Sequence, residues 1–272
     1  YKKKKGFPKF KKKYDKNSFT LVGHQYSIKD NKLRIANQKS LMKVNWHREL
    51  QSKPSSCTIT KDNIGRYYIS FVVEVDDKIV PYTKSMIGLD LGIETFCTTS
   101  DDKRYKLPNM KSLYKKVKRQ QKELSRKKKG SNNFKKQKLK LAKTHMKIVD
   151  IRTDFHNKLV STIINENQVI SIETLKVKEM LMKSNKSLSK LAGQQGWSSF
   201  ITKPISKASE CNRIIHKADT YYPSSQLCSN CGYKWGRLNL SIRTIKCQEC
   251  LVEHERDINA AKNMLNNYLK TI

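Results

Sequence analysis

Two acidic residues lie in segments whose neighbours predict buried strands. Asp90 stands between Leu89 and Leu91, and Glu173 follows the apolar run that ends at Ile172. A carboxylate in such a place needs a compensating charge. Since neighbouring strands lie about 4.8 Å apart, two acids at matching heights can bind a cation jointly.

A third acid, Asp257, opens the last predicted helix. Stepping along that helix by three or four residues gives the small or apolar residues Ala260, Ala261 and Met264, a stripe that would turn Asp257 toward the same sheet. Three converging carboxylates suit phosphodiester hydrolysis, in which two Mg²⁺ ions about 4 Å apart activate water and stabilise the leaving oxygen. We therefore expect Asp90, Glu173 and Asp257 to be catalytic magnesium ligands.

Each acid also has an ordinary structural interpretation. Asp90 could cap a turn, Glu173 could pair with a lysine, and Asp257 could be a helix N-terminal charge. Two other acids near apolar segments, Asp150 and Glu166, are interpreted as surface-facing helix residues.

Four of the seven cysteines form two close pairs, Cys228 with Cys231 and Cys247 with Cys250, separated by fifteen residues. This spacing is typical of a four-thiolate zinc ribbon, whose closed tetrahedral site is structural. Gly232 favours the tight knuckle. Disulfides or chance pairing are the alternative. The odd cysteine total suits a reducing cytoplasm better than disulfides.

The order of predicted elements indicates an α/β protein. Residues 1–84 alternate β-like runs, such as Lys32–Ile35, with turn signals, such as Asp30 and Asn31, and predict a small β-barrel or curled sheet. Residues 85–222 first predict a three-strand meander and then a basic helical hairpin over 110–166, broken near Gly130. A strand over 169–174 and a polar, mobile connection over 175–193 follow. The segment is expected to end with a helix over 195–212, kinked or ended early by Pro204, and a strand over 213–221. Residues 223–254 form the zinc insert, and 255–272 the last helix.

The charge indicates a polyanionic partner. Lys and Arg number 57 against 23 Asp and Glu, a formal net charge of +34, and such an excess favours nucleic acid through counterion release. Between Lys111 and Lys147 there are 16 basic residues and one acid, with Leu139, Ala142, Met146 and Val149 expected on a packing face. The segment Lys2–Lys13, with Phe7, Phe10 and Tyr14 nearby, could bind nucleic acid or be a disordered tail. No apolar run reaches the ~18 residues of a membrane span, so we expect a soluble protein.

Together these motifs resemble the TnpB family of transposon-encoded nucleases and the related compact type V CRISPR effectors. The segments that carry the resemblance are Gly88–Ile93, Ser171–Leu175, Pro223–Gly232 and Glu255–Ala261. The resemblance implies a RuvC nuclease domain of RNase H-like fold with an inserted zinc ribbon, preceded by part of a wedge β-barrel. It matches Asp90, Glu173 and Asp257 to the three RuvC acids and the four cysteines to the zinc ligands.

The resemblance also implies an activity: an RNA-guided, Mg²⁺-dependent DNA endonuclease with guide RNA and target DNA as partners. It further implies that the chain lacks an N-terminal recognition lobe. Leu251 departs from the family, which commonly has glycine after the second knuckle. Three alternatives remain: a non-cutting RNA-guided repressor, a zinc-ribbon DNA-binding accessory protein of a transposon, and a stand-alone junction resolvase, which would leave the ribbon unexplained.

Overall fold

The computed structural model describes residues 17–76, 80–183, 186–239 and 241–272, and these fall into two compact units. The first unit contains the described residues up to 76 together with 127–143, and the second contains the rest. The predicted basic segment Lys2–Lys13 lies outside the described residues. Among the described helices, none combines the length and the apolar character that crossing a membrane requires.

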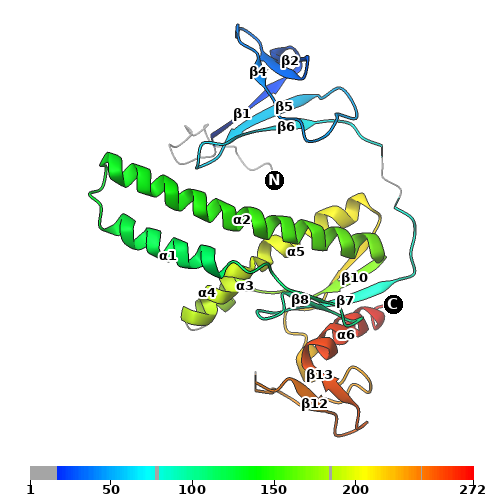
Figure 1. The fold of residues 1–272 in the computed structure, drawn as a ribbon. Helices are drawn as coiled ribbons and strands as arrows, with labels where there is room; N and C mark the ends of the chain where they lie inside the picture. Colours follow the sequence, from blue (N-terminus) through cyan, green and yellow to red (C-terminus); the bar gives the residue numbers. More distant parts are fainter. Residues whose placement is uncertain (1–16, 77–79, 184–185, 240) are drawn as a thin grey trace, which may run out of the picture. The chain divides into compact units, whose positions relative to one another are not determined.

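The first unit contains two antiparallel three-stranded sheets (Figure 1). One has the order β1 (Asn17–Val22), β5 (Ser56–Lys61), β6 (Tyr67–Val72), and the other the order β2 (Tyr26–Lys29), β3 (Lys32–Ile35), β4 (Met42–Lys43); a short 3₁₀ helix, η1 (Gly23–Gln25), joins β1 to β2. The predicted turn at Asp30 and Asn31 is present, with φ of 50° and 57°, and these two residue types tolerate that conformation well. Closure of the two sheets into a barrel stays a prediction.

Two basic helices follow, α1 (Lys111–Ser125) and α2 (Asn132–Glu166). The predicted break between them is present: Gly130 has a φ of +86°, and the Ser131 hydroxyl accepts a hydrogen bond from the Phe134 amide at 3.1 Å, which caps the start of α2.

The predicted packing face of α2 was partly wrong. Leu139 and Val149 are 41% and 38% exposed, whereas Ile148 and Thr144 are buried. The face is set further along the helix by Leu159, which belongs to the main core. At 3.6 residues per turn, Ile148 and Thr144 lie near the same face of the helix as Leu159, whereas Val149 does not.

The second unit is built on a five-stranded sheet in the order β11 (Ile214–Lys217), β10 (Val169–Ile172), β7 (Met86–Leu91), β8 (Cys97–Thr99), β9 (Arg104–Tyr105). The strands β11, β10 and β7 are parallel, and the predicted meander β7–β8–β9 is antiparallel. The chain is thus a mixed α/β protein, as expected.

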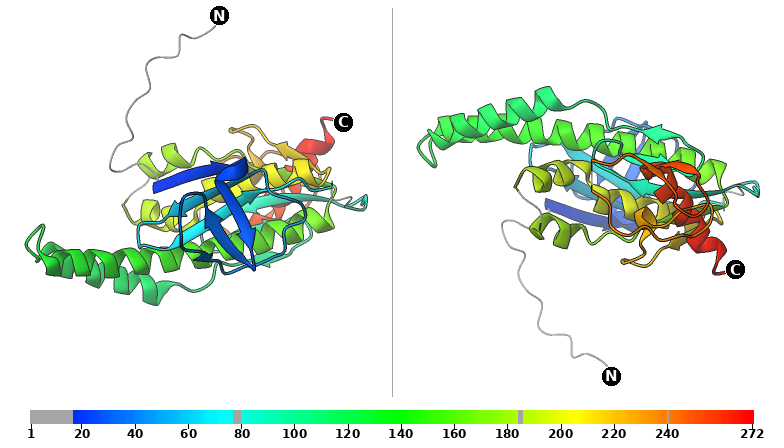
Figure 2. Two further views of the ribbon diagram at one scale, coloured as in Figure 1. Left: turned by 90° about the horizontal axis from the view of Figure 1, so that it is seen from above. Right: turned by 90° about the horizontal axis from the view of Figure 1, so that it is seen from below.

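Helices cover both faces of this sheet (Figure 1). The C-terminal part of α2 and helix α5 (Trp197–Glu210) share one hydrophobic core with the strands, while α6 (Arg256–Leu269) contacts β7, β10 and β8. In the right-hand view of Figure 2, α6 lies in front of these strands, with α5 behind them.

Two predictions for residues 175–212 were wrong. The polar connection contains two helices, α3 (Val177–Lys183) and α4 (Lys186–Gln195), because Met180, Leu181 and Ala192 pack on the main core. Helix α5 also continues past Pro204, so the predicted early end was wrong, whereas the alternative of a kink stays a prediction. Pro204 is buried, and the preceding turn has local side-chain bonds, with the Thr202 hydroxyl donating to the Ser199 carbonyl at 3.1 Å.

Candidate metal sites of the second unit

Strand alternation places Asp90 and Glu173 on the α6 side of the sheet. Leu89 and Ile172 are partners in the parallel pairing of β7 with β10 and face the core shared with α2 and α5. Asp90 follows Leu89, and Glu173 follows Ile172. Successive side chains of a strand point to opposite faces. Asp90 therefore lies within β7 on the face that α6 covers, and Glu173, the residue directly after the end of β10, continues the alternation beside it.

Helix α6 approaches this face closely at two points. A Cβ built on Gly88 would lie 2.0 Å from the Ala261 carbonyl oxygen, so only glycine allows the observed contact. On β10, the buried Ser171 hydroxyl donates to the Met264 carbonyl at 2.6 Å. The predicted stripe of Ala260, Ala261 and Met264 is buried.

Electrostatics link the third acid to the first two. Asp257 lies in the first turn of α6. Burial raises the pKa of Asp90 well above its usual value, the negative charges of Glu173 and Asp257 raise it further, and Arg256 opposes them. Burial likewise raises the pKa of Glu173. Carboxylates that disfavour each other's ionisation form a site that a cation would stabilise.

One arginine from the cysteine-bearing insert reaches this site. The Arg243 guanidinium lies 2.9 Å from the Glu94 carboxylate and 3.8 Å from that of Asp257, and its backbone carbonyl accepts a hydrogen bond from the Arg256 amide at 2.8 Å. The first turn of α6 is therefore attached to the insert.

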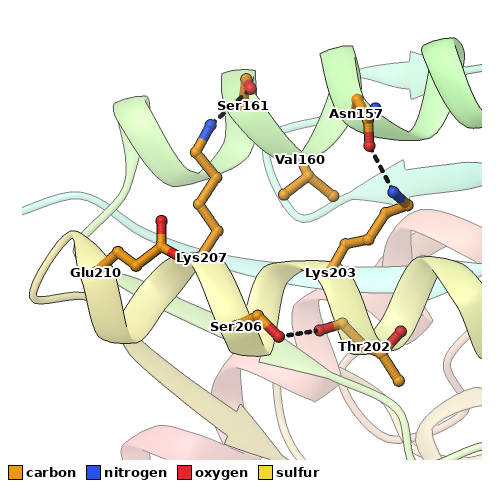
Figure 3. A pocket seen from close by; sticks show the side chains of 8 residues that line it. All are labelled: Asn157, Val160, Ser161, Thr202, Lys203, Ser206, Lys207 and Glu210. Atoms are coloured by element: carbon orange, nitrogen blue, oxygen red, sulfur yellow. Dashed lines mark hydrogen bonds between the residues drawn. The ribbon is translucent and has the colours of Figure 1, made fainter. Parts of the chain in front are cut away.

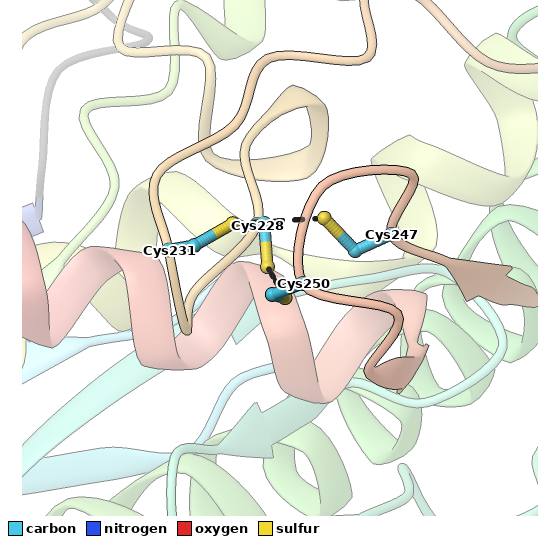
Figure 4. A group of neighbouring side chains, drawn as sticks. All are labelled: Cys228, Cys231, Cys247 and Cys250. Carbon is cyan, nitrogen blue, oxygen red and sulfur yellow. Dashed lines mark hydrogen bonds between the residues drawn. The ribbon is translucent and has the colours of Figure 1, made fainter.

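The four cysteines converge (Figure 4). The sulfur atoms of Cys228, Cys231, Cys247 and Cys250 all lie within 4.8 Å of one another, and the Cys228–Cys250 and Cys231–Cys247 pairs are each 3.6 Å apart. No disulfide joins them. Tetrahedral Zn–S bonds of about 2.3 Å would place sulfurs about 3.8 Å apart, so these residues fit such an ion. Within the described ranges this is the one such group, and the three acids do not form another.

Both knuckles have the same backbone geometry. The Gly232 amide donates to the Cys228 carbonyl at 2.9 Å, and the Leu251 amide donates to the Cys247 carbonyl at 3.1 Å. Gly232 and Leu251 both adopt left-handed backbone conformations, with φ of +81° and +60°. Hydrogen bonds from the Val252 backbone and the Asn230 side chain lower the pKa of Cys250 to about 6, which favours the thiolate that binds metal.

A shallow groove lies between α2 and α5 (Figure 3). Lys203 and Lys207, one helical turn apart, each donate to a neutral oxygen of α2: the ammonium of Lys203 to Asn157 at 2.5 Å, and that of Lys207 to Ser161 at 2.7 Å. Both lysines are half-buried, and no acid pairs with either of them among the described residues. We call this surface the lysine groove.

Several site residues were missed from the sequence. His254 lies with its Nε2 3.0 Å from the Cys228 sulfur, and Asn259 and Asn263 are buried on α6. The repeat of asparagine at 259, 263 and 266, one face of a helix, was the available signal. Trp235 is half-buried, and its indole N–H donates to the Ser225 carbonyl at 3.2 Å. Asp150 and Glu166 are exposed, as predicted.

Family comparisons agree along most of the chain. Residues 70–184 match the OrfB_IS605 model, described as a probable transposase, and residues 197–264 match the Cas12f1-like TNB domain. These segments contain Asp90, Glu173, Asp257 and the four cysteines.

Two relatives and one solved structure illustrate the similarity. A Streptomyces pristinaespiralis protein named "Putative RNA-guided DNA endonuclease" is 30% identical over 267 residues, covering 97% of this chain and 66% of that protein. TnpB-like protein L79 of Acanthamoeba polyphaga mimivirus is 28% identical over 248 residues, covering 84% of this chain and 46% of that protein. A chain of a Cas12f1–sgRNA–target DNA complex aligns with a TM-score of 0.48 and 17% identity, covering 92% of this chain and 67% of that one. The chain therefore spans between about half and two thirds of these relatives' lengths.

Proposed function

From the premise that this chain belongs to the TnpB family, we propose that it carries the nuclease site of an RNA-guided DNA endonuclease. Its relative from Streptomyces pristinaespiralis is named for that activity. The observation that carries the proposal is the proximity of the three acids: Asp90 lies in β7, Glu173 directly follows the paired strand β10, and the charges of Glu173 and Asp257 both raise the pKa of Asp90.

We assign the second unit to the RuvC type of nuclease, with an RNase H-like sheet. Support comes from its strand order, in which an antiparallel meander continues into two parallel strands, and from helices on both faces. The two sheets of the first unit would then be the remaining part of a wedge barrel.

The three acids suit two Mg²⁺ ions because Mg²⁺ prefers carboxylate and water ligands. Such ions, when bound, would activate water and stabilise the leaving oxygen of a phosphodiester. The chain's own residues set the positions. Asp90 is held on β7 and Glu173 at the end of β10, two strands packed on the main core, and Asp257 is held by a helix that contacts β7 directly.

The nearby arginines add positive charge where a phosphate would approach. Arg243 lies 3.8 Å from Asp257, and the positive charge of Arg256 lowers the pKa of Asp90. Each could balance phosphate charge that the acids alone would repel. The cysteine cluster, with four thiolates and no open position, suits a structural Zn²⁺ ion.

Guide RNA and target DNA are the partners that we propose. The net charge of +34 supports a polyanion, as do the basic helices α1 and α2, which would contact an RNA–DNA duplex through its backbone. The lysine groove offers two half-buried ammonium groups whose bonding partners are neutral oxygens, and it is suited to phosphates.

The test is cleavage of target DNA by protein purified with its co-expressed RNA in Mg²⁺. Asp90→Ala should abolish cleavage, with a loss on the order of 10³-fold or more, while RNA and DNA binding persist. Asp150→Ala, at an exposed acid of α2, is the matched control and should cut normally. Cleavage by Asp90→Ala at the normal rate would reject the site, and binding without cleavage by the unmodified protein would favour a non-cutting repressor.

A further inference from the structure

The face of α6 that turns away from the sheet is fastened to the first cysteine knuckle by asparagines. Asn259 both accepts and donates: its Oδ1 accepts from the Ser229 amide at 2.9 Å, and its Nδ2 donates to the Leu227 carbonyl at 2.7 Å. Both partners flank Cys228, so Asn259 closes onto the backbone of the first metal-binding pair.

Two more asparagines extend this contact along the helix. The Asn263 amide nitrogen donates to the carbonyls of Ser224 at 2.8 Å and Leu227 at 2.7 Å, and the Asn266 amide nitrogen donates to the Ser229 carbonyl at 2.9 Å. Asn259 and Asn263 are 1% and 3% exposed. Buried amides with these bonds satisfied hold one geometry, since each broken bond leaves an unpaired buried group.

The opposite face of the same helix is fixed by the sheet. Ala261 lies against Gly88, and the Met264 carbonyl accepts the Ser171 hydroxyl. Helix α6 is thus held between the sheet and the knuckle, and Asp257 lies only two residues before Asn259. A change in the knuckle backbone would move the first turn of α6, whereas Asp90 and Glu173, on the strands, would stay in place.

From these contacts we infer that Asn259 and Asn263 are positioning residues for Asp257, through which zinc in the ribbon controls the metal affinity of the nuclease site. The inference rests on the proposed function, because it assigns Asp257 to that site. Bound zinc would fix the backbone around Cys228. Through their hydrogen bonds to that backbone, the asparagines fix the position of α6, and the position of α6 sets that of the Asp257 carboxylate.

The first test uses Asn259→Ala with Asn263→Ala in the full chain. Asn267→Ala is the matched control, because Asn267 is on the same helix and its side chain makes no hydrogen bond to any described residue. Mn²⁺ binding is measured by electron paramagnetic resonance, zinc content by metal analysis, and cleavage in a Mn²⁺ titration. Zinc should stay at one per chain, while the Mn²⁺ dissociation constant rises roughly tenfold, as for partners that orient metal ligands.

Catalysis separates positioning from a general loss of structure. The double variant should cut slowly at low Mn²⁺, regain most of its rate when Mn²⁺ is raised, and bind target DNA with unchanged affinity. Misfolding would not be reversed by Mn²⁺. Mn²⁺ affinity and hydrogen exchange of α6 equal to those of Asn267→Ala would overturn the inference.

A second measurement needs no substitution and covers the case in which the double variant does not fold. Zinc is removed from the unmodified protein by a chelator, the chelator is dialysed away, and Mn²⁺ binding is measured before and after zinc is restored. Thiolates are poor ligands for Mn²⁺, so the signal reports the acids. Affinity should fall without zinc and return with it; equal affinity in both states would reject the coupling. If Asp90→Ala binds Mn²⁺ as well as the unmodified protein, the proposed function fails instead.

Discussion

Gly88 contacts the backbone of Ala261 so closely that no residue with a side chain could replace it. A Cβ at position 88 would lie 2.0 Å from the Ala261 carbonyl oxygen and 2.7 Å from the Leu265 amide nitrogen. Gly88→Ala should therefore push α6 off β7. We expect a loss of 1–3 kcal/mol or more in the free energy of unfolding, the usual cost of overpacking, and a large fall in cleavage because Asp257 moves with the helix. Chemical denaturation and cleavage assays measure the two effects.

Gly193→Ala is the control for this substitution. Gly193 lies in α4, its nearest neighbour to a new Cβ would be 4.0 Å away, and alanine is the better helix former. This variant should be stabilised by about 0.5–1 kcal/mol. Equal free energies of unfolding for Gly88→Ala and Gly193→Ala would show that α6 can move away from β7 without destabilising the fold.

Leu251 is strained in the second knuckle, where its counterpart in the first is Gly232. Its φ of +60° is unfavourable for a side-chain-bearing residue, and the side chain is 67% exposed, so little packing is lost on its removal. Leu251→Gly should stabilise the ribbon by about 1 kcal/mol and slow zinc release to a chelator. Gly232→Leu should do the opposite, and faster zinc release from Leu251→Gly would contradict the strain argument.

His156 should make the second unit sensitive to acid. It is 1% exposed, and its ring centroid lies 4.9 Å from that of Phe96. Burial, aided by the nearby Arg152 charge, lowers the pKa of His156 from 6.5 to about 4. Below pH 6.5 the unfolded chain binds a proton at His156 more readily than the folded protein does. The free energy of unfolding should therefore be highest above pH 6.5 and fall by about 3 kcal/mol as the pH falls toward 4.

The substitution His156→Phe keeps an aromatic ring at this position and removes the titratable imidazole. Its free energy of unfolding should vary less between pH 7 and pH 4 than that of the unmodified protein, as measured by denaturation at each pH. His145→Phe, at an exposed position on the same helix, should leave the pH dependence intact. A pH dependence in His156→Phe equal to that of the control would assign it to other groups.

The lysine groove should contribute to nucleic-acid affinity and its salt dependence. Replacing Lys203 and Lys207 with glutamine should reduce the slope of log affinity against log salt by about 1.8, which is about 0.9 for each of two lost phosphate contacts. The pair Lys186 and Lys190, exposed on α4 at the same spacing, is the control. Binding to a labelled guide–target duplex over a salt series measures the slope. An equal change in both double variants would mean that only total charge matters.

Local signals in the sequence accounted for much of the fold. Strand β3 and the Asp30–Asn31 turn were predicted, because turn residues and alternation act within a few positions. The cysteine spacing likewise predicted a cluster whose sulfurs do converge. In these cases the physical cause lies in the segment itself.

The failures share a different cause, which is tertiary packing. Residues 175–193 were predicted to be a mobile connection because serines and lysines hid the apolar residues Met180, Leu181 and Ala192, which pack together only once the main core exists. The asparagines of α6 were likewise unassigned, since their partners on the knuckle lie more than 30 positions away in sequence. The assignment of Asp90, Glu173 and Asp257 as magnesium ligands stays a prediction.

The place of α6 after the cysteine-bearing insert also bears on biosynthesis. Asp90 and Glu173 leave the ribosome well before Asp257, and domains tend to fold as they emerge. While translation is under way, the strands can present two carboxylates, but the third arrives only when the ribbon ahead of it has been made. A nascent chain would therefore hold only two of the three proposed metal ligands until this segment has been translated.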